Sequence, residues 1–180
     1  MDYIEVQKLI LDRIERHRIG AVLGFFEDGD DIWWCNSGCI VKMPYDGFYM
    51  DTEKVNREVN IHYREFDKRT LFFGNLIDRQ REDMKRVSVL GIRDDKYIGF
   101  KTGEDIFFAW YDDYKFFKPF FLLPDKQPIT FSVLRSNKSC TPEVFVFQGD
   151  ELVGIMKTFY TKVGTQNDGQ GENSTADYWD

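Results

Sequence analysis

The chain has 180 residues, of which 42% are hydrophobic, and this is enough to bury one proper core, so we expect a single domain. Its formal net charge of −7 excludes the overall basic character of a nucleic-acid binder, although a local basic face needs positive potential only where it meets phosphates. Aromatic residues make up 17% of the chain, which predicts a core of stacked rings with some rings left at the surface for a partner.

The chain contains no membrane-spanning or targeting pattern. No window reaches about 18 consecutive apolar residues. Residues Met1–Glu5 lack the basic start and apolar run of a signal peptide. The three cysteines, Cys35, Cys39 and Cys140, are an odd number and do not indicate a disulfide framework. The sequence therefore predicts a soluble, cytoplasmic protein with no membrane partner.

The N-terminal part predicts one helix followed by three strands. Apolar residues of segment 2–18 recur at the spacing of one helix face, and Gly20 follows as a stop. The acidic turn 27–31 joins strands expected at Ala21–Phe26 and Ile32–Cys35 as a hairpin. A third strand is expected at Cys39–Met43.

Residues 51–86 carry no clear periodicity and are interpreted as a charged insertion. Within them, Glu53–Glu58 and Asn75–Arg86 are dense in charge and are candidates for exposed helix. In contrast, Asn60–Phe66 and Thr70–Phe73 have strand-like runs.

The C-terminal half predicts strands around one short helix. Strands are expected at Val87–Ile92, Lys96–Lys101 and Asp105–Ala109, and a helix at Tyr111–Lys118, which Pro119 limits. The period of two then predicts three closing strands. These are Ile129–Arg135, Glu143–Gln148 and Glu151–Lys157.

The globular part is expected to span residues 1–163. Residues 164–180 are too polar to bury enough area to offset the entropy of ordering, so we expect a flexible tail. At its end Tyr178 and Trp179 stand between acidic residues, and this is either a short docking motif or an unstructured terminus.

The search for catalytic chemistry is mostly negative. His17 and His62 lie in no arrangement that suggests nucleophilic catalysis, and the Cys35–Cys39 spacing lacks further zinc ligands. No phosphate-cradling glycine motif occurs. Asp112 and Asp113, beside Glu104 and Asp105, could supply a pair of carboxylates for acid–base chemistry, whereas acids at a helix start are far commoner and suit the N-terminus of the expected helix. We therefore expect a protein that is not an enzyme and holds no cofactor or metal.

Three stretches of the chain resemble one family. They are GAVLGFFEDGDDIWWCNSGCIVKMP at 20–44, DIFFAWYDDYKFFKPF at 105–120, and the closing strands ITFSVLR with PEVFVFQGDELVGIMK. Together with the first helix they are similar to one domain of the DNA sliding clamps of the bacterial β-clamp type. Two features depart from the family: Ile155–Thr158 replaces its Met-Pro-Met-Arg-like end, and residues 51–86 have no counterpart.

The resemblance implies an α+β fold in which two helices pack on one face of antiparallel β-sheets. Several copies would close a ring around duplex DNA, with the helices facing phosphates, and a groove would bind a DNA polymerase or another replication protein. On this basis the phosphate-contacting residues are expected to be Lys8, Arg13, Arg16, Arg18, Lys115 and Lys118. The residues expected to bind a partner are Met156, Tyr178 and Trp179.

The leading hypothesis is thus a non-catalytic, clamp-like processivity protein of DNA replication or repair that forms a homo-oligomer. Since a one-domain version is unusual for a housekeeping clamp, a phage or mobile-element origin is the accompanying conjecture. The alternative is an acidic protein-interaction or inhibitor domain that does not bind DNA, with an acidic surface suited to a basic partner. A small enzyme built on the acid pair is the third hypothesis.

Overall fold

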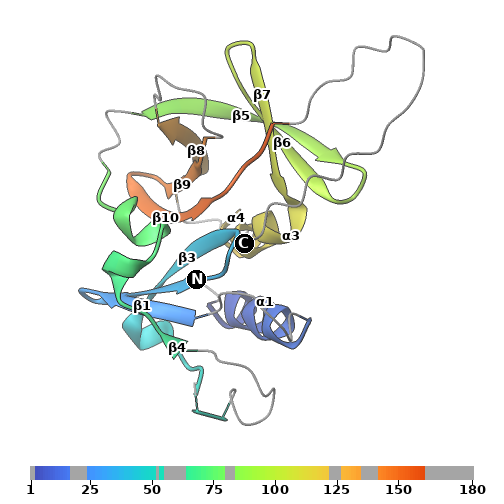
Figure 1. Ribbon diagram of the computed structural model, residues 1–180. Helices are drawn as coiled ribbons and strands as arrows, with labels where there is room; N and C mark the ends of the chain where they lie inside the picture. Colours follow the sequence, from blue (N-terminus) through green and yellow to red (C-terminus); the bar gives the residue numbers. More distant parts are fainter. Residues whose placement is uncertain are drawn as a thin grey trace.

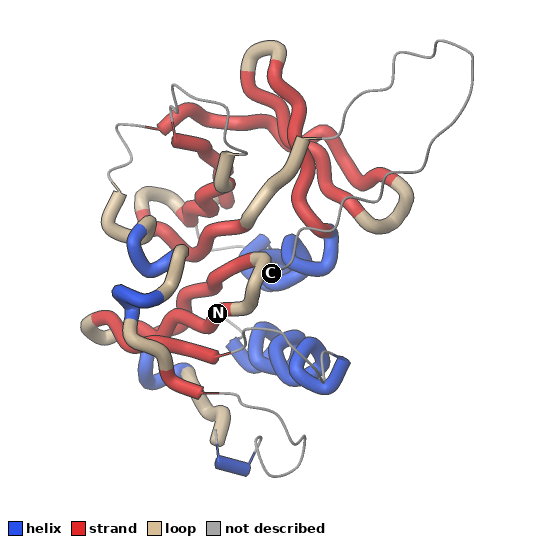
Figure 2. The backbone as a smooth tube through the Cα atoms, in the orientation of Figure 1, coloured by secondary structure: helices blue, strands red, loops and turns tan. Residues whose placement is uncertain are grey.

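The computed structural model describes residues 3–16, 24–51, 53–54, 64–79, 84–121, 127–134 and 142–160. Its described strands form one 10-stranded sheet, with helices packed against it (Figures 1 and 2). The predicted α+β class is therefore confirmed.

Nearly all of the sheet is antiparallel. Its only parallel neighbours among the described strands are β4 and β1. In spatial order the strands are β4 (Arg64–Glu65), β1 (Gly24–Asp28), β2 (Asp31–Cys35), β3 (Cys39–Pro44), β10 (Glu151–Met156), β9 (Val144–Gln148), β8 (Ile129–Leu134), β5 (Met84–Arg93), β6 (Tyr97–Thr102) and β7 (Asp105–Trp110).

The chain beyond β10 pairs with β7, which brings together the two ends of the second half of this sheet. The Phe159 backbone N–H donates to the Phe108 carbonyl at 2.8 Å, and the Phe108 N–H donates to the Phe159 carbonyl at 2.9 Å. Because Phe159 follows β10 and Phe108 belongs to β7, the six strands from β10 to β7 form an incomplete ring.

Two helical segments cover one face. The predicted helix is confirmed as α1 (Tyr3–Arg16), which fully buries Val6, Ile10 and Ile14. The predicted apolar face is only partly confirmed: it included Ile10 and Ile14 but also Ile4 and Leu11, which are 54% and 38% exposed. The second segment runs through α3 (Tyr111–Tyr114), η5 (Lys115–Phe117) and α4 (Lys118–Phe121). The two segments lie side by side (Figure 1), and both contribute to the larger core cluster, in which Trp34, Phe100, Phe107 and Phe117 are buried.

The opposite face of the sheet has a core of its own. Trp33, Ile40 and Phe145 alternate with residues of the first core and point into this second cluster. Phe66, Leu71, Phe73, Leu76 and Ile77 pack against it from the segment that contains η2 (Lys68–Thr70) and η3 (Phe73–Asn75). Part of the predicted charged insertion therefore covers the sheet.

Three local predictions are wrong. Thr70–Phe73 is not a strand: Thr70 ends η2 and Phe73 begins η3. Leu71 and Phe73 pack on the sheet, whereas Phe72 is 51% exposed. The helix expected over Asn75–Arg86 fails at its end, where Met84–Arg86 begin β5 and pair with β8. Pro119 does not end the helical segment; it occupies the first turn of α4, where proline loses no helical hydrogen bond.

Candidate functional site

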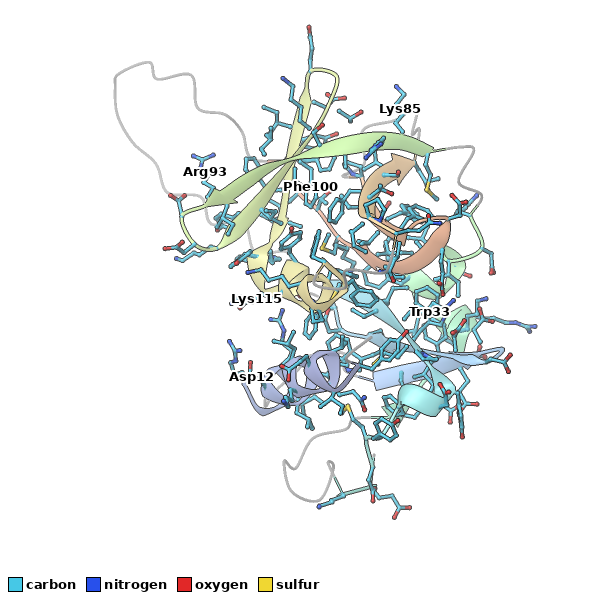
Figure 3. All side chains as sticks on the ribbon, turned by 180° about the vertical axis from the view of Figure 1, so that it is seen from behind. Asp12, Trp33, Lys85, Arg93, Phe100 and Lys115 are labelled. Atoms are coloured by element: carbon cyan, nitrogen blue, oxygen red, sulfur yellow. The ribbon has the colours of Figure 1, made fainter. Side chains whose placement is uncertain are left out.

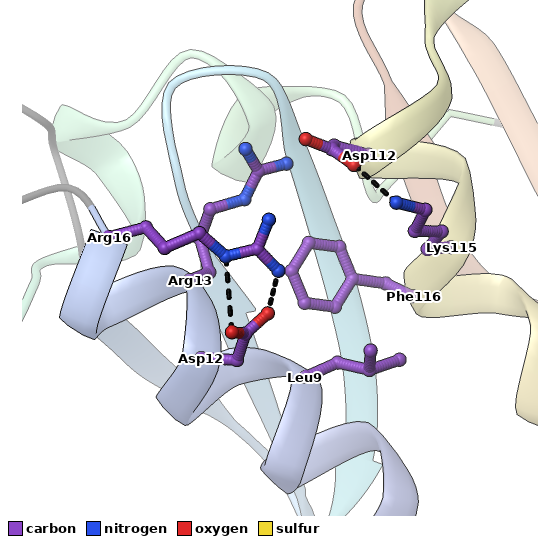
Figure 4. Close-up of a pocket in the computed structure, with 7 residues that line it drawn as sticks. All are labelled: Leu9, Asp12, Arg13, Arg16, Asp112, Lys115 and Phe116. Atoms are coloured by element: carbon purple, nitrogen blue, oxygen red, sulfur yellow. Dashed lines mark hydrogen bonds and ion pairs between the residues drawn. The ribbon is translucent and has the colours of Figure 1, made fainter. Parts of the chain in front are cut away.

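The two helical segments bring three of the predicted phosphate-contacting cations to one cleft (Figure 4). Arg13 and Arg16 come from the last turn of α1, and Lys115 comes from η5. The cleft encloses only about 10 Å³, and its other lining residues are Leu9, Asp12, Asp112 and Phe116. That volume is close to what one water molecule needs.

Each of these cations has a carboxylate partner. Arg16 pairs with Asp12 one helical turn earlier, and the Lys115 Nζ lies 2.6 Å from the Asp112 Oδ1. Arg13 Nη2 donates to Asp113 Oδ1 at 2.6 Å. Each of the three cations is therefore already paired with a carboxylate, and an incoming phosphate would have to displace carboxylates before it could pair with the cations.

The ionised form of Asp112 is favoured by this arrangement. The hydrogen bond from Lys115 lowers the pKa of the Asp112 carboxyl below its usual value of 3.8, and the positive charges of Lys115, Arg13 and Arg16 act in the same direction. Asp112 thus remains an anion at neutral pH and competes with any external anion at this cleft.

Arg13 and Asp113 belong to a buried polar cluster that joins three elements. Asp113 also accepts a hydrogen bond from Asn36 Nδ2 at 3.3 Å, and Asn36 Oδ1 accepts from the backbone N–H groups of Gly38 at 2.6 Å and Cys39 at 2.7 Å. A side chain at Gly38 would overlap the Asp113 carboxylate. The hydrogen bonds of this cluster therefore connect α1 and α3 to the β2–β3 turn.

The other predicted DNA contacts are less closely grouped. Lys8 pairs with Glu5 on the exposed side of α1. Lys118 donates to the Tyr111 hydroxyl, and its Nζ lies 4.7 Å from the Tyr111 ring centroid. Arg18 lies outside the described residues.

The predicted partner-binding residues are placed only in part. Met156 is fully buried and pairs with Cys39, so its side chain belongs to the core rather than to the surface. Tyr178 and Trp179 lie outside the described residues.

The carboxylates of the candidate acid pair have different partners in the structure. Asp112 binds Lys115, and Asp113 is buried against Arg13. Glu104 lies in the β6–β7 turn, at the opposite end of β7 from α3. Within the described part of the chain, no group of three or more His, Cys, Asp or Glu side chains could hold a metal ion. No helix among the described residues is long and apolar enough to cross a membrane.

The outer face of β6 and β7 carries aromatic side chains that sequence reasoning did not group into one surface. Cross-strand pairs Tyr97–Trp110 and Gly99–Phe108 point away from Phe100 and Phe107, which lie in the core. Ring centroids are 5.1 Å apart for Tyr97 and Trp110, and 5.8 Å apart for Trp110 and Phe159. We call Tyr97, Phe108, Trp110 and Phe159 the outer aromatic cluster.

Trp110 is the most informative member because it is 50% exposed although it contacts two other rings. Leu90 is 52% exposed and lies against Gly99, on the same face of the sheet as the outer aromatic cluster. The sequence did contain a signal: Ile106–Trp110 is apolar at every position, which predicts a strand with apolar side chains on both faces.

A second open surface is a groove along α1. It has a volume of about 510 Å³. Gln7 fixes one wall, since its side chain accepts from the Tyr49 N–H at 2.7 Å and donates to the Tyr3 carbonyl at 3.1 Å. The groove is lined by Ile4, Gln7, Lys8, Leu11, Tyr49, Met50, Asp51 and Lys54.

No protein-family model, curated protein or solved structure matches this chain. The assignment of a functional surface therefore depends on the geometry and chemistry of the described residues. On those grounds the helix cleft is occupied by its own ion pairs. In the outer aromatic cluster Phe108 is buried and lies 5.7 Å from the Arg93 guanidinium, whereas Trp110 presents apolar area to solvent.

Proposed function

We propose that this protein is a non-catalytic protein-binding domain whose recognition surface is the outer aromatic cluster together with Leu90. The observation that carries the proposal is the half-exposed Trp110 within a group of mutually contacting rings. Tryptophan and tyrosine are enriched among the residues that dominate binding energy, and clustered apolar exposure marks interaction surfaces.

The rigidity of the surface supports the same function. Trp110 ends β7 and is paired across the sheet with Tyr97, while Phe159 is held on β7 by two backbone hydrogen bonds through Phe108. Side chains that are already ordered lose little conformational entropy when a partner covers them.

The test is capture of a protein partner by the full chain from its native cells, with nuclease added. We expect one dominant protein partner, and Trp110→Ala should weaken its binding roughly 30-fold, the effect of losing one dominant contact. Glu104→Ala, at an exposed position in the β6–β7 turn at the other end of β7 from Trp110, is the control and should leave binding unchanged. Equal binding by the wild-type and Trp110→Ala proteins would contradict the proposal.

A clamp-like accessory protein of DNA replication or repair is the second candidate, favoured by the side-by-side helical segments. They bring Arg13, Arg16 and Lys115 to one cleft, as helices that line a channel around duplex DNA would do. This function requires several copies in a ring, and a polymerase or other replication protein as a further partner.

The clamp candidate is tested by light scattering and by DNA binding over a range of salt concentrations. The clamp candidate requires a mass several times that of the monomer. Arg16→Glu should lower the salt dependence of DNA binding by the equivalent of about one phosphate contact. Lys101→Glu, on the exposed part of β6, is the matched control. A monomer without salt-dependent DNA binding excludes this candidate and leaves the protein-binding proposal intact.

A further inference from the structure

The chain leaves the described part of the structure beside the outer aromatic cluster. Phe159 belongs to the cluster and is held on β7 by its two backbone hydrogen bonds with Phe108. Tyr160 is the last described residue, and residues 161–180 follow it. Trp179 is 19 positions beyond Tyr160, and a chain of that length spans at most about 60 Å. Residues near position 179 are therefore tethered to the cluster by a length of chain that lets them return to it.

The segment that follows the described part carries negative charge and one aromatic pair. It contains a single lysine and four carboxylates, which gives a net charge of −3. Two of the carboxylates, Asp177 and Asp180, flank Tyr178 and Trp179. We call these four residues the acidic aromatic motif. A surface that binds the motif has to offer both a positive charge and exposed apolar area.

The outer face of β6 and β7, with the adjoining half of β5, offers both. The register places Arg93, Tyr97 and Trp110 in one row across the three strands, on the face of the outer aromatic cluster. Lys101 lies on the same face, opposite Ile106. None of the described residues that the register places on this face of the three strands is a carboxylate. The face therefore differs in charge from the whole chain, whose net charge is −7.

Arg93 holds its charge against the rings of the cluster. Its guanidinium lies 5.7 Å from the Phe108 ring centroid, and Figure 3 shows its side chain at the surface, pointing away from the interior that contains Phe100. Its contact with Asp94, at 3.5 Å, joins two side chains that are 59% and 71% exposed, so water screens the pair. An incoming carboxylate can therefore pair with Arg93 while a neighbouring ring packs on Trp110.

The spacing within the motif fits this arrangement. Arg93 and Trp110 are two strands apart in one row, which is about 10 Å. In an extended chain Asp177 and Trp179 project to the same side and are about 7 Å apart. The long side chain of Arg93 closes the difference. One extended passage of the motif across the strands thus brings its carboxylate to the arginine and its indole to Trp110.

The α1 groove is the other open apolar surface, and its charges suit the motif less well. Lys8 in the groove is paired with Glu5. Lys54 is accompanied by Asp51, whose carboxylate also lines the groove and accepts from the Lys54 backbone N–H at 2.9 Å. The charges at the groove are therefore balanced, whereas those on the outer face of the strands are positive.

We propose that the acidic aromatic motif docks on the outer aromatic cluster of its own chain and competes with a protein partner for it. Trp179 packs against Trp110, and the Asp177 carboxylate pairs with Arg93. The tether makes this association intramolecular, which raises the effective concentration of the motif at the cluster. The docking is independent of the proposed protein-binding function, whereas the competition rests on that function.

The first test uses the full chain with p-benzoylphenylalanine in place of Trp179. Ultraviolet light should cross-link this residue to Tyr97 or Trp110 of the same chain, and mass spectrometry locates the cross-link. Arg93→Glu should lower the ratio of cross-linked to uncross-linked chain roughly fivefold, as expected when an exposed charge pair becomes a like-charge pair. Lys54→Glu beside the α1 groove is the control and should leave the ratio unchanged.

A charge swap separates pairing from a merely structural role of Arg93. Asp177→Lys added to the Arg93→Glu variant should restore the ratio, because the pair is then opposite in charge again. Absence of this restoration would overturn the docking. Cross-links to the α1 groove, cross-links between two chains, or no cross-links at all would overturn it as well.

The second test measures how strongly the captured partner binds the Y178A/W179A variant. Loss of an internal competitor should strengthen binding at least twofold, since a surface that the motif occupies half of the time or more becomes available. A partner that needs Trp110 but binds the variant and the wild-type protein equally would refute the competition and leave the proposed function intact. Cross-links at the cluster without any captured partner would support the docking and count against the proposed function.

Discussion

Arg13 does not have the surroundings of an exposed helix cation. Its side chain is 14% exposed, that of Asp113 is 7% exposed, and its guanidinium lies 5.6 Å from the Phe116 ring centroid. Arg13→Met leaves the Asp113 carboxylate buried without its arginine. We therefore expect the free energy of unfolding, measured with urea, to fall by about 3–5 kcal/mol.

Arg16→Met in the same helical turn is the matched control for this prediction. The Arg16 and Asp12 side chains are 56% and 49% exposed, so the loss should stay below about 1 kcal/mol. Similar losses in the two variants would show that the Arg13–Asp113 pair is not the buried connection between α1 and α3.

The thiols of Cys35 and Cys39 are buried and should be unreactive in the folded protein. Burial raises the pKa of Cys35 from its usual value of 9.0 to about 12, and burial also raises the pKa of Cys39. Because the thiolate is the reactive form, alkylation at pH 8, located by mass spectrometry, should be slow at both residues until urea unfolds the chain. Rapid alkylation of Cys39 in the native protein would contradict the buried β2–β3 turn.

The same pKa shift has a consequence for stability. A thiol whose pKa is raised by folding stabilises the native state fully below pH 9, and this contribution is lost as the pH rises toward 12. Cys35→Ala should therefore reduce the loss of stability over this alkaline range.

At the scale of elements, a helical segment lies close against the sheet at Gly154 in β10. A Cβ there would lie 2.5 Å from the Ile40 carbonyl oxygen and would overlap the Phe117 ring. Gly154→Ala should push η5 away from the sheet and lower the free energy of unfolding by about 1–3 kcal/mol, measured by urea denaturation.

The Gly154→Ala/Phe117→Leu double variant tests that cause. Leucine removes the part of the ring that the new methyl group would meet, so the combined loss should be smaller than the sum of the two single losses. Additive losses would locate the strain at the Ile40 carbonyl alone.

At the scale of the whole molecule, the sheet order predicts a gradient of local stability. All five residues of β9 are buried and the strand lies between β8 and β10, whereas β4 is a two-residue strand at the sheet edge. Amide hydrogen exchange should therefore be slowest in β9 and fastest in β4 among the strands. Equal protection of the two strands would contradict this order.

Local patterns alone predicted α1 and most strands. The spacing of Ile10 and Ile14, and the turns between β1 and β2 and between β5 and β6, depend on neighbours close in sequence. The segment that contains Phe73 could not be predicted in this way, because its apolar side chains pack on strands that are distant in sequence and follow no regular spacing.

The amino-acid sequence by itself determined the α+β class, the amphipathic first helix and the strand-rich closing segment, because hydrophobic periodicity and turn residues act over a few positions. Only the tertiary structure decided which charges and rings are available at the surface. Arg13 is neutralised by Asp113, 100 positions away, and Trp110 meets Phe159 through the pairing that brings the chain beyond β10 onto β7. Whether a charge or a ring is available at the surface depends on neighbours that are distant in sequence, and local periodicity contains no information about them.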